Sequence, residues 1–215
     1  YQPKAIGLDI FRDLPVEPGH ETLVEALREI PNIVGVEVAL NQEDMLNIKP
    51  PPELPPERVG FADLLIDMDG KLRRSLLASR TWKGDLKYSL AIQLARSYLR
   101  SQGIQFEHGS LATDSIRFGS VKLFRFLSNS GGYVRADANG NQMLLNFCRG
   151  QKPFRTLSLT DVLTRDFEPD WIRDRVVMIG TIAASVKDTF ITSAVRETLF
   201  SHDFGAQPLS NQLDR

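Results

Sequence analysis

The stretch Arg173-Asp-Arg-Val-Val-Met-Ile-Gly-Thr-Ile-Ala-Ala-Ser-Val-Lys-Asp-Thr-Phe190 contains a short, wholly apolar run, Val176 to Ile179, that stops at Gly180. A short apolar run with charge before it and glycine after it predicts a strand buried on both faces of a parallel sheet. The polar loop that follows leaves the carboxyl end of this strand, which is where open α/β sheets bind ligands. An ordinary connection has the same appearance, because the position of a loop is only a weak indication of function.

The first 40 residues predict a βαβ unit, with strands over residues 5–11 and 33–40 and a helix over residues 22–30. The helix is indicated by one apolar stripe made of Leu23, Ala26, Leu27 and Ile30. A strand, a helix and a strand in this order require a crossover connection, which implies parallel pairing.

Later segments predict two hairpins and two helices. Asp69-Gly70 separates strand-like runs over residues 61–67 and 72–78, and Asn139-Gly140 separates runs over residues 133–136 and 142–147. Helices are expected over residues 88–99 and 158–163, and a bulge or turn is expected near Ser120. The prolines of residues 49–57 indicate a stiff internal connection or a partner-binding motif. The predicted fold class is α/β: a mostly parallel sheet flanked by helices, with inserted antiparallel β-hairpins.

Composition narrows the class of protein. Hydrophobic residues make up 42% of the chain, charged residues 25%, and the net charge is −1, as in a folded soluble domain. This charge gives no electrostatic case for binding nucleic acid or an anionic membrane. No apolar run approaches the ~18 residues that would insert this segment into a bilayer.

Cysteine and histidine give no sign of a disulfide or a metal site. Cys148 is the only cysteine, so no internal disulfide can form. His20, His108 and His202 lack the spacing of metal ligands and are expected on the surface or in loops. We expect no metal and no cofactor. Arg73 and Arg74 are expected to point to opposite faces of a strand, so that only one of them lines any single pocket.

Several short blocks carry a resemblance to a known family through their order and spacing. They are Ile6-Gly-Leu-Asp-Ile-Phe-Arg-Asp-Leu-Pro15, Val59-Gly-Phe-Ala-Asp63, Asp67-Met-Asp-Gly-Lys-Leu-Arg-Arg74, Gly131-Gly-Tyr133, Leu144-Leu-Asn146, Ser158-Leu-Thr-Asp-Val-Leu163, Asp174-Arg-Val-Val-Met-Ile-Gly180 and Ala184-Ser-Val-Lys-Asp188. Together they resemble the type-two CHASE family of cyclase/histidine-kinase-associated sensing extracellular domains, in a form most similar to its cyanobacterial branch. We therefore expect residues 1–215 to form a single sensor domain, truncated at both ends.

The resemblance implies a sensor without catalytic residues on the extracytoplasmic, or periplasmic, side of the cell membrane. Transmembrane helices outside this segment would join it to a cytoplasmic kinase or cyclase output domain in the same polypeptide. The expected partner is a small-molecule ligand of unknown identity, and homodimerisation is left open. A structural dimerisation module without a ligand is one alternative. Another is a metal-assisted α/β hydrolase that uses Asp9 and Asp188.

The expected ligand site is the carboxyl edge of the parallel sheet, with Asn146 as a weaker candidate. Its candidate residues come from the first strand and from the last loop: Asp9, Phe11, Arg12, Thr181, Ser185, Lys187 and Asp188. Alternatively, Asp9 caps a loop and Asp188 pairs with Arg173 or Arg175.

Overall fold

The computed structural model describes residues 1–41, 46–109, 115–147, 154–182, 189–192, 197–200 and 207–208 of the 215-residue chain. The helices in these ranges are α1 (His20–Glu29), η2 (Pro56–Arg58), α2 (Leu90–Arg100), α3 (Leu159–Thr164) and η3 (Pro169–Trp171). The strands are β1 (Ala5–Asp9), β2 (Ile33–Glu37), β3 (Val59–Phe61), β4 (Lys71–Leu72), β5 (Arg74–Arg80), β6 (Leu86–Tyr88), β7 (Phe106–His108), β8 (Ile116–Phe118), β9 (Val121–Lys122), β10 (Asn141–Leu144), β11 (Val176–Gly180), β12 (Thr189–Thr192), β13 (Glu197–Phe200) and β14 (Gln207–Pro208).

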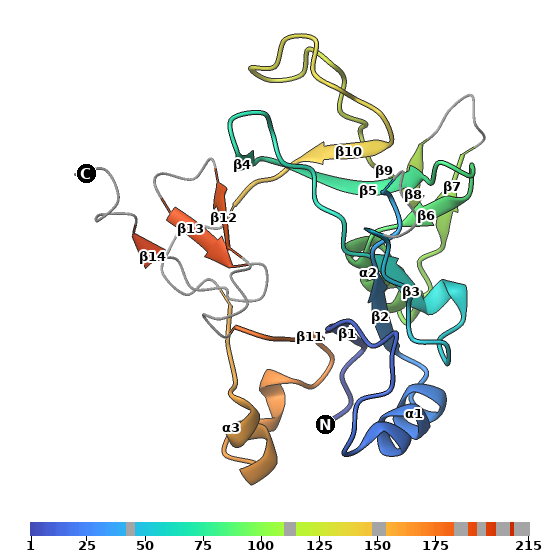
Figure 1. The fold of residues 1–215 in the computed structure, drawn as a ribbon, viewed down its shortest axis with the longest axis vertical. Coiled ribbons are helices and arrows are strands. Elements are labelled where there is room, and N and C mark those ends of the chain that lie inside the picture. The colour runs from blue at the N-terminus through green and yellow to red at the C-terminus, as the bar shows by residue number, and fades with distance from the viewer. Residues whose placement is uncertain are drawn as a thin grey trace.

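The central feature is a parallel sheet of four strands in the order β11-β1-β2-β3 (Figure 1). The predicted βαβ unit is present, because α1 connects β1 to β2 and the two strands pair in parallel. The α/β class is confirmed.

The two longer helices pack on opposite faces of this sheet. Successive side chains of a strand point to alternate faces, so Ala5 packs with Leu90 and Leu94 of α2, whereas Ile6 and Leu8 pack with the core that contains Leu27 of α1. The result is a layer of sheet between two layers of helix, which is how α/β domains bury both faces of a parallel sheet.

The proline-rich segment is an internal connection, as the stiffness of its sequence indicates. It carries the chain from β2 to β3, and its Pro51 and Leu54 are buried. A Cβ atom at Gly35 would come within 2.6 Å of Leu54 Cδ1. This glycine therefore lets the segment lie directly against β2.

A second region of the fold is antiparallel and shares α2 with the parallel sheet. Strands β10-β5-β6 form one small sheet, and β7-β8-β9 form another. Their common core contains Leu77, Ala78 and Ile116, and it also includes Ile92 of α2. Helix α2 thus contributes Leu90 and Leu94 to one core and Ile92 to the other.

Three local predictions are confirmed. The turn at Asp69-Gly70 is present, with Gly70 at φ +77° and its N–H donating to Asp67 O at 2.8 Å. The hairpin predicted around it is reduced to a single antiparallel bridge between Ile66 and Leu72, because β3 ends at Phe61 and β5 pairs with β10 and β6. The chain reverses between β8 and β9 at residues 119–120. The start of α3 is a capping box, in which Ser158 Oγ accepts from Asp161 N at 3.1 Å and Ser158 N donates to Asp161 at 2.8 Å.

The predicted hairpin at Asn139-Gly140 is wrong. Strand β10 pairs with β5, and residues 133–136 form no strand. The Asn-Gly pair still makes a sharp turn, with Gly140 at φ +70°, but the strand that follows the turn pairs with β5, which is distant in sequence. Long-range pairing with β5 replaces the local pairing that the turn residues suggest.

The expectation that Val176 to Ile179 is buried on both faces is also wrong. Strand β11 lies at the edge of the sheet, and Val176, Met178 and Ile179 are 42%, 37% and 46% exposed. A continuous apolar run predicts that a strand is buried, but it does not show whether a helix or a loop packs against that strand.

We predict that Gly60→Ala destabilises the fold by about 1–3 kcal/mol, the usual effect of overpacking a core. A Cβ atom at Gly60 would lie 2.4 Å from Leu90 Cα and 2.5 Å from Leu90 N, and backbone at the start of a helix cannot move aside cheaply. Denaturant unfolding would measure the change. Gly132→Ala is the matched control, because nothing lies within 4 Å of its added Cβ atom. Equal stability of the two variants would contradict the close approach of β3 and α2.

Candidate functional site

The carboxyl edge of the parallel sheet brings the first and last predicted site segments together. In the register of β1 and β11, Asp9 lies opposite Gly180. The chain leaves β1 toward β2 on one side, and β11 adds on the other side, so the strand order reverses between β1 and β11. Such a reversal opens a crevice at the carboxyl ends of the two strands, the usual ligand position in open α/β sheets.

The described candidate residues at this edge are Asp9, Phe11, Arg12 and Thr181. Asp9 and Arg12 are half-buried, whereas Phe11 and Thr181 are exposed. Three further candidates, Ser185, Lys187 and Asp188, lie outside the described residues.

Asn146 lies in a different part of the fold. It follows β10, which pairs with β5, and its neighbour Leu145 donates through N–H to Arg73 O at 2.9 Å. Figure 1 shows β10 and β11 in separate regions of the molecule. Asn146 is therefore not brought next to Asp9.

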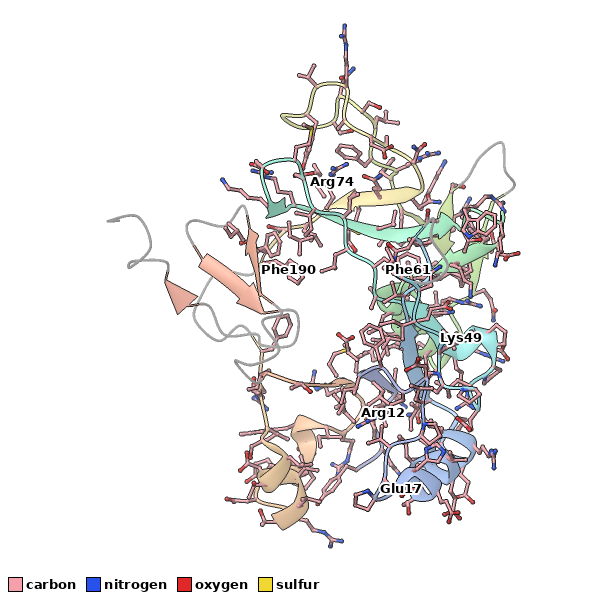
Figure 2. The ribbon with its side chains drawn as sticks, viewed as in Figure 1. Arg12, Glu17, Lys49, Phe61, Arg74 and Phe190 are labelled. Carbon is pink, nitrogen blue, oxygen red and sulfur yellow. The ribbon has the colours of Figure 1, made fainter. Side chains whose placement is uncertain are left out.

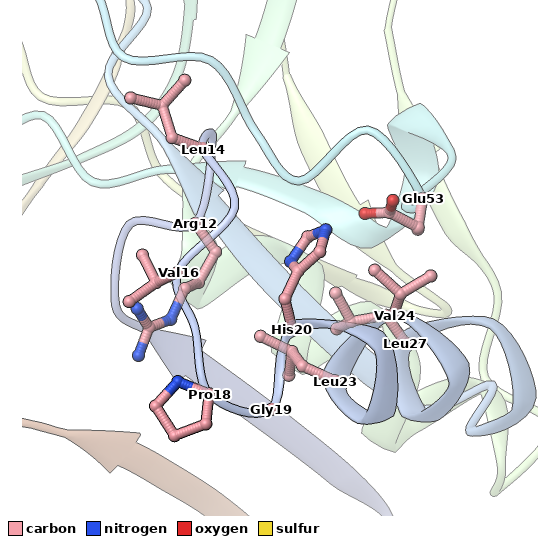
Figure 3. Close-up of a pocket in the computed structure, with 10 residues that line it drawn as sticks. All are labelled: Arg12, Leu14, Val16, Pro18, Gly19, His20, Leu23, Val24, Leu27 and Glu53. Atoms are coloured by element: carbon pink, nitrogen blue, oxygen red, sulfur yellow. The ribbon is translucent and has the colours of Figure 1, made fainter.

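An open pocket of about 240 Å³ lies beside this edge, between the β1–α1 loop and α1 (Figure 3). Leu23, Val24 and Leu27 of α1 form one wall. The loop and the proline-rich connection supply the remaining lining residues, which are Arg12, Leu14, Val16, Pro18, Gly19, His20 and Glu53.

Glu17 fixes the base of the loop at the start of α1. Its carboxylate accepts from Gly19 N at 3.0 Å and His20 N at 3.5 Å. These are N–H groups at the amino end of the helix, where a negative charge is stabilising. The carboxylate thereby holds the turn that leads the chain from the pocket into α1.

Of the pocket residues, the sequence reasoning found only Arg12. The missed signal was the pair Leu14 and Val16, two apolar side chains in a loop that otherwise reads as a polar turn. Glu53 was not foreseeable, because its approach depends on how the proline-rich connection folds over α1. His20 was expected on the surface or in a loop, and it is the first residue of α1 and lines the pocket.

A second cluster of side chains surrounds Asp67, and its members belong to the sequence blocks that carry the family resemblance. Arg74 donates to Asp67 Oδ1 through Nε at 3.0 Å and also through Nη2. Arg73 Nη1 donates to Asp67 Oδ2 at 2.8 Å, and the Tyr133 hydroxyl donates to the same oxygen. The side chains of Asp67 and Arg74 are only 8% and 6% exposed.

Arg74, labelled in Figure 2, has both polar and aromatic partners. Its Nη1 donates to Asp137 O at 2.8 Å and to Gln142 Oε1 at 2.9 Å. Its Cζ lies 5.1 Å and 4.9 Å from the ring centroids of Phe126 and Tyr133, within cation–π range. One buried cation therefore ties β5, β10 and residues 126–137 together.

The expectation that Arg73 and Arg74 point to opposite faces fails here. Regular strand pairing breaks at Arg73, between β4 and β5, so the alternation of a continuous strand does not apply. Both guanidinium groups consequently reach the one carboxylate of Asp67.

The cluster also shifts the acidity of its members. Burial raises the pKa of Asp67, but the hydrogen bonds from Tyr133, Arg73 and Arg74 outweigh burial, and the net pKa is lowered. Hydrogen bonding to Arg73 lowers the pKa of the more exposed Asp69 to about 2. Burial and hydrogen bonding to Asp67 raise the pKa of Tyr133, so this side chain remains a protonated donor.

The described residues contain no group of three His, Cys, Asp or Glu side chains placed as potential metal ligands. His108 instead contacts polar neighbours, with Nδ1 3.0 Å from the Tyr88 hydroxyl and Nε2 3.3 Å from Asn141 Nδ2. None of the helices in the described ranges has the length and apolar character that a bilayer span requires.

A comparison of the sequence with models of protein families identifies the family of the chain. The model of the CHASE2 domain matches residues 1–214. The chain belongs to the CHASE2 family. CHASE2 domains are extracellular sensory domains of multidomain signalling proteins, and the family is sensory, not catalytic. Comparison with curated proteins and with solved structures gives no match.

We predict that Asp67→Asn lowers the free energy of unfolding of this CHASE2 domain by about 3–5 kcal/mol, because it leaves the buried Arg74 without its anion. Denaturant unfolding near neutral pH would measure the loss. Asp69→Asn is the matched control, since Asp69 contacts Arg73 at 2.6 Å but its side chain is 50% exposed. We expect a much smaller change there. Equal losses in the two variants would show that burial of the Asp67–Arg74 pair is unimportant.

We also predict acid sensitivity from the same carboxylates. Both have a lower pKa in the folded state than in the unfolded state, so their contribution is present above about pH 4 and is lost as the pH falls below it, toward about 2 for Asp69. Unfolding followed across this window should show a steeper loss for the wild type than for Asp67→Asn. Parallel pH profiles would contradict the assignment of the lowered pKa to Asp67.

Proposed function

We propose that the chain is the signal-sensing input domain of a membrane-bound bacterial signal-transduction protein. Transmembrane helices tether it on the periplasmic side and join it to a cytoplasmic kinase or nucleotide cyclase. Membership of a family of extracellular sensory domains supports this proposal. The observation that carries it within the fold is the pairing of Asp9 with Gly180, which directs the loops after β1 and β11 to one edge.

A small ligand binds at this edge. Its binding shifts the population between two arrangements of the domain, and this shift relays the signal. Asp9, Phe11, Arg12 and Thr181 contact it from the described segments. Ser185, Lys187 and Asp188 follow Thr181 in the chain and complete the site. Asn146 acts, if at all, at a separate point near β10.

A dimerisation relay without a ligand is the second candidate. The position of β11 at the edge of the sheet, among the strands that the structure describes, favours it, because an edge strand with exposed apolar side chains is a template for pairing with another chain. In that case association of two copies would itself be the signal.

The decisive experiment is a thermal-shift screen of ions, amino acids, sugars and nucleotides on the 215-residue chain. A ligand at 100-fold its Kd adds about 2.7 kcal/mol, which raises the Tm of a domain of this size by several degrees. We expect a hit whose shift is lost in Asp9→Ala and kept in Asp85→Ala. Asp85 is an exposed control at a distant turn between β5 and β6.

Two results would speak against this proposal. A ligand that still raises the Tm of Asp9→Ala would show that the binding site does not lie at the sheet edge. If no compound shifts the Tm, while the chain dimerises with increasing concentration in sedimentation, the dimerisation relay replaces the ligand sensor.

A further inference from the structure

We infer that copies of this chain associate head to tail, with a basic lobe at one end of the molecule docked into an acidic hollow of a second copy. The basic lobe is residues 121–136, and the acidic hollow is the open space between α1, residues 12–19 and Glu53. This inference goes beyond the proposed sensing function. It follows from the apolar side chains, the charges and the positions of the two surfaces.

The basic lobe presents apolar groups to solvent from a loop that is held in place. Three of its large apolar side chains are 65% to 87% exposed: Phe124, Leu127 and Val134. The loop folds back on itself, because Ala136 N donates to Ser128 O at 3.0 Å. Its inner side is anchored by Phe126, which is only 3% exposed and packs on Arg74. Exposed apolar groups gathered in one ordered loop mark a surface for a partner.

The charge of the basic lobe defines that partner further. Residues 121–136 contain no Asp or Glu and three exposed cations, which are Lys122, Arg125 and Arg135. When the next residue, Asp137, is included, this end of the molecule still has three cations and one anion. The chain as a whole has a net charge of −1. The partner of the lobe therefore combines apolar surface with negative charge.

The acidic hollow has this composition. The pocket of Figure 3 continues along α1 into a larger open space of about 640 Å³, with which it shares His20, Val24 and Glu53. The charged residues that line the combined space are four glutamates and two arginines: Glu21, Glu25, Glu29, Glu53, Arg12 and Arg28. Leu14 and Val16 add apolar surface that is 69% and 55% exposed. A space that is open along a helix suits a protruding loop of another protein.

The two surfaces lie at opposite ends of the molecule. Figure 1 shows α1 at the lower end of the long axis and the loop that leads into β10 at the upper end. A single copy cannot bring them together, but every other copy offers the complement. Such a contact joins two different surfaces, so each pair of copies keeps one free lobe and one free hollow and can add further copies.

Sedimentation velocity of the 215-residue chain tests for this contact. We expect species larger than a dimer as the protein concentration rises. We also expect weaker association in about 0.5 M NaCl than in about 0.05 M, because salt screens the attraction between exposed charges.

Two variants separate the lobe from the hollow. Phe124→Ser removes an exposed aromatic group of the lobe, and Glu25→Lys/Glu29→Lys reverses two charges of the hollow. Each should weaken self-association at least about tenfold. An equimolar mixture of the two should form a dimer with one copy of each, because the first variant keeps its hollow and the second keeps its lobe. This dimer should not grow, since its two remaining surfaces are the altered ones.

Matched controls remove the same kinds of group elsewhere. Leu163→Ser removes an apolar side chain of α3 that is 73% exposed, and Asp166→Lys/Glu168→Lys reverses two exposed charges. None of these residues belongs to the lobe or lines the hollow. Both controls should associate like the wild type. Formation of the mixed dimer further shows that both test variants fold, because each must supply one intact surface.

Three outcomes would overturn the inference: a wild type that stays monomeric, variants that associate like the wild type, and a mixture that stays monomeric. A dimer that survives both variants would place the contact elsewhere, as at the edge of β11. A monomeric wild type that binds phosphatidylglycerol vesicles, when Phe124→Ser does not, would assign the lobe to a lipid surface instead. The thermal-shift screen depends on Asp9, which lines neither surface, so either proposal can fail without the other.

Discussion

Strand β1 is hydrogen-bonded on both sides, and the position of the candidate site depends on that constraint. Its partner β2 is close in sequence, but its partner β11 lies near the other end of the chain. The pairing with β11 closes a very long loop, and loop closure costs entropy that grows only slowly with length. Once it is made, Asp9 and Gly180 lie side by side, and the loops that follow them share one edge of the sheet.

The parallel sheet and the antiparallel region are held by different forces. The sheet is a layered apolar core, in which Gly7, Gly35 and Gly60 allow side chains or backbone to pack closely against the strands. The antiparallel region is organised around the ion pair of Asp67 and Arg74, whose partners come from segments far apart in sequence. Helix α2 joins the two, since it contributes to both cores. A change at the sheet edge therefore has a packed route toward the second region.

This arrangement suits a sensory domain. The polar groups around Arg74 are hydrogen-bonded to one another, so that cluster stabilises the structure. The groups around the pocket are the reverse case, because Arg12 and Glu53 have no partner in the described part of the chain. Unpaired charge beside exposed apolar surface is what a binding partner can complete. The loop that carries Arg12 begins directly after Asp9, at the end of β1.

Local sequence determined the elements whose signals are local. These are the apolar stripes of α1 and α2, the Ser158–Asp161 capping box, the turn at Gly70 and the α/β class itself. The sequence also indicated that the loops after Asp9 and Gly180 share one edge of the sheet, through the apolar strands that end at these two residues. Only the tertiary structure decided the partner of β10, the exposed position of β11, the convergence of Arg73 and Arg74 on Asp67, and the approach of Glu53 to α1. The reason is physical: periodicity and capping act between residues a few positions apart, whereas the partner of β10, the exposure of β11 and the approach of Glu53 depend on contacts between segments far apart in sequence. Arg73 and Arg74 are close to Asp67 in sequence, but their convergence depends on the break in strand pairing at Arg73, which the sequence pattern does not show.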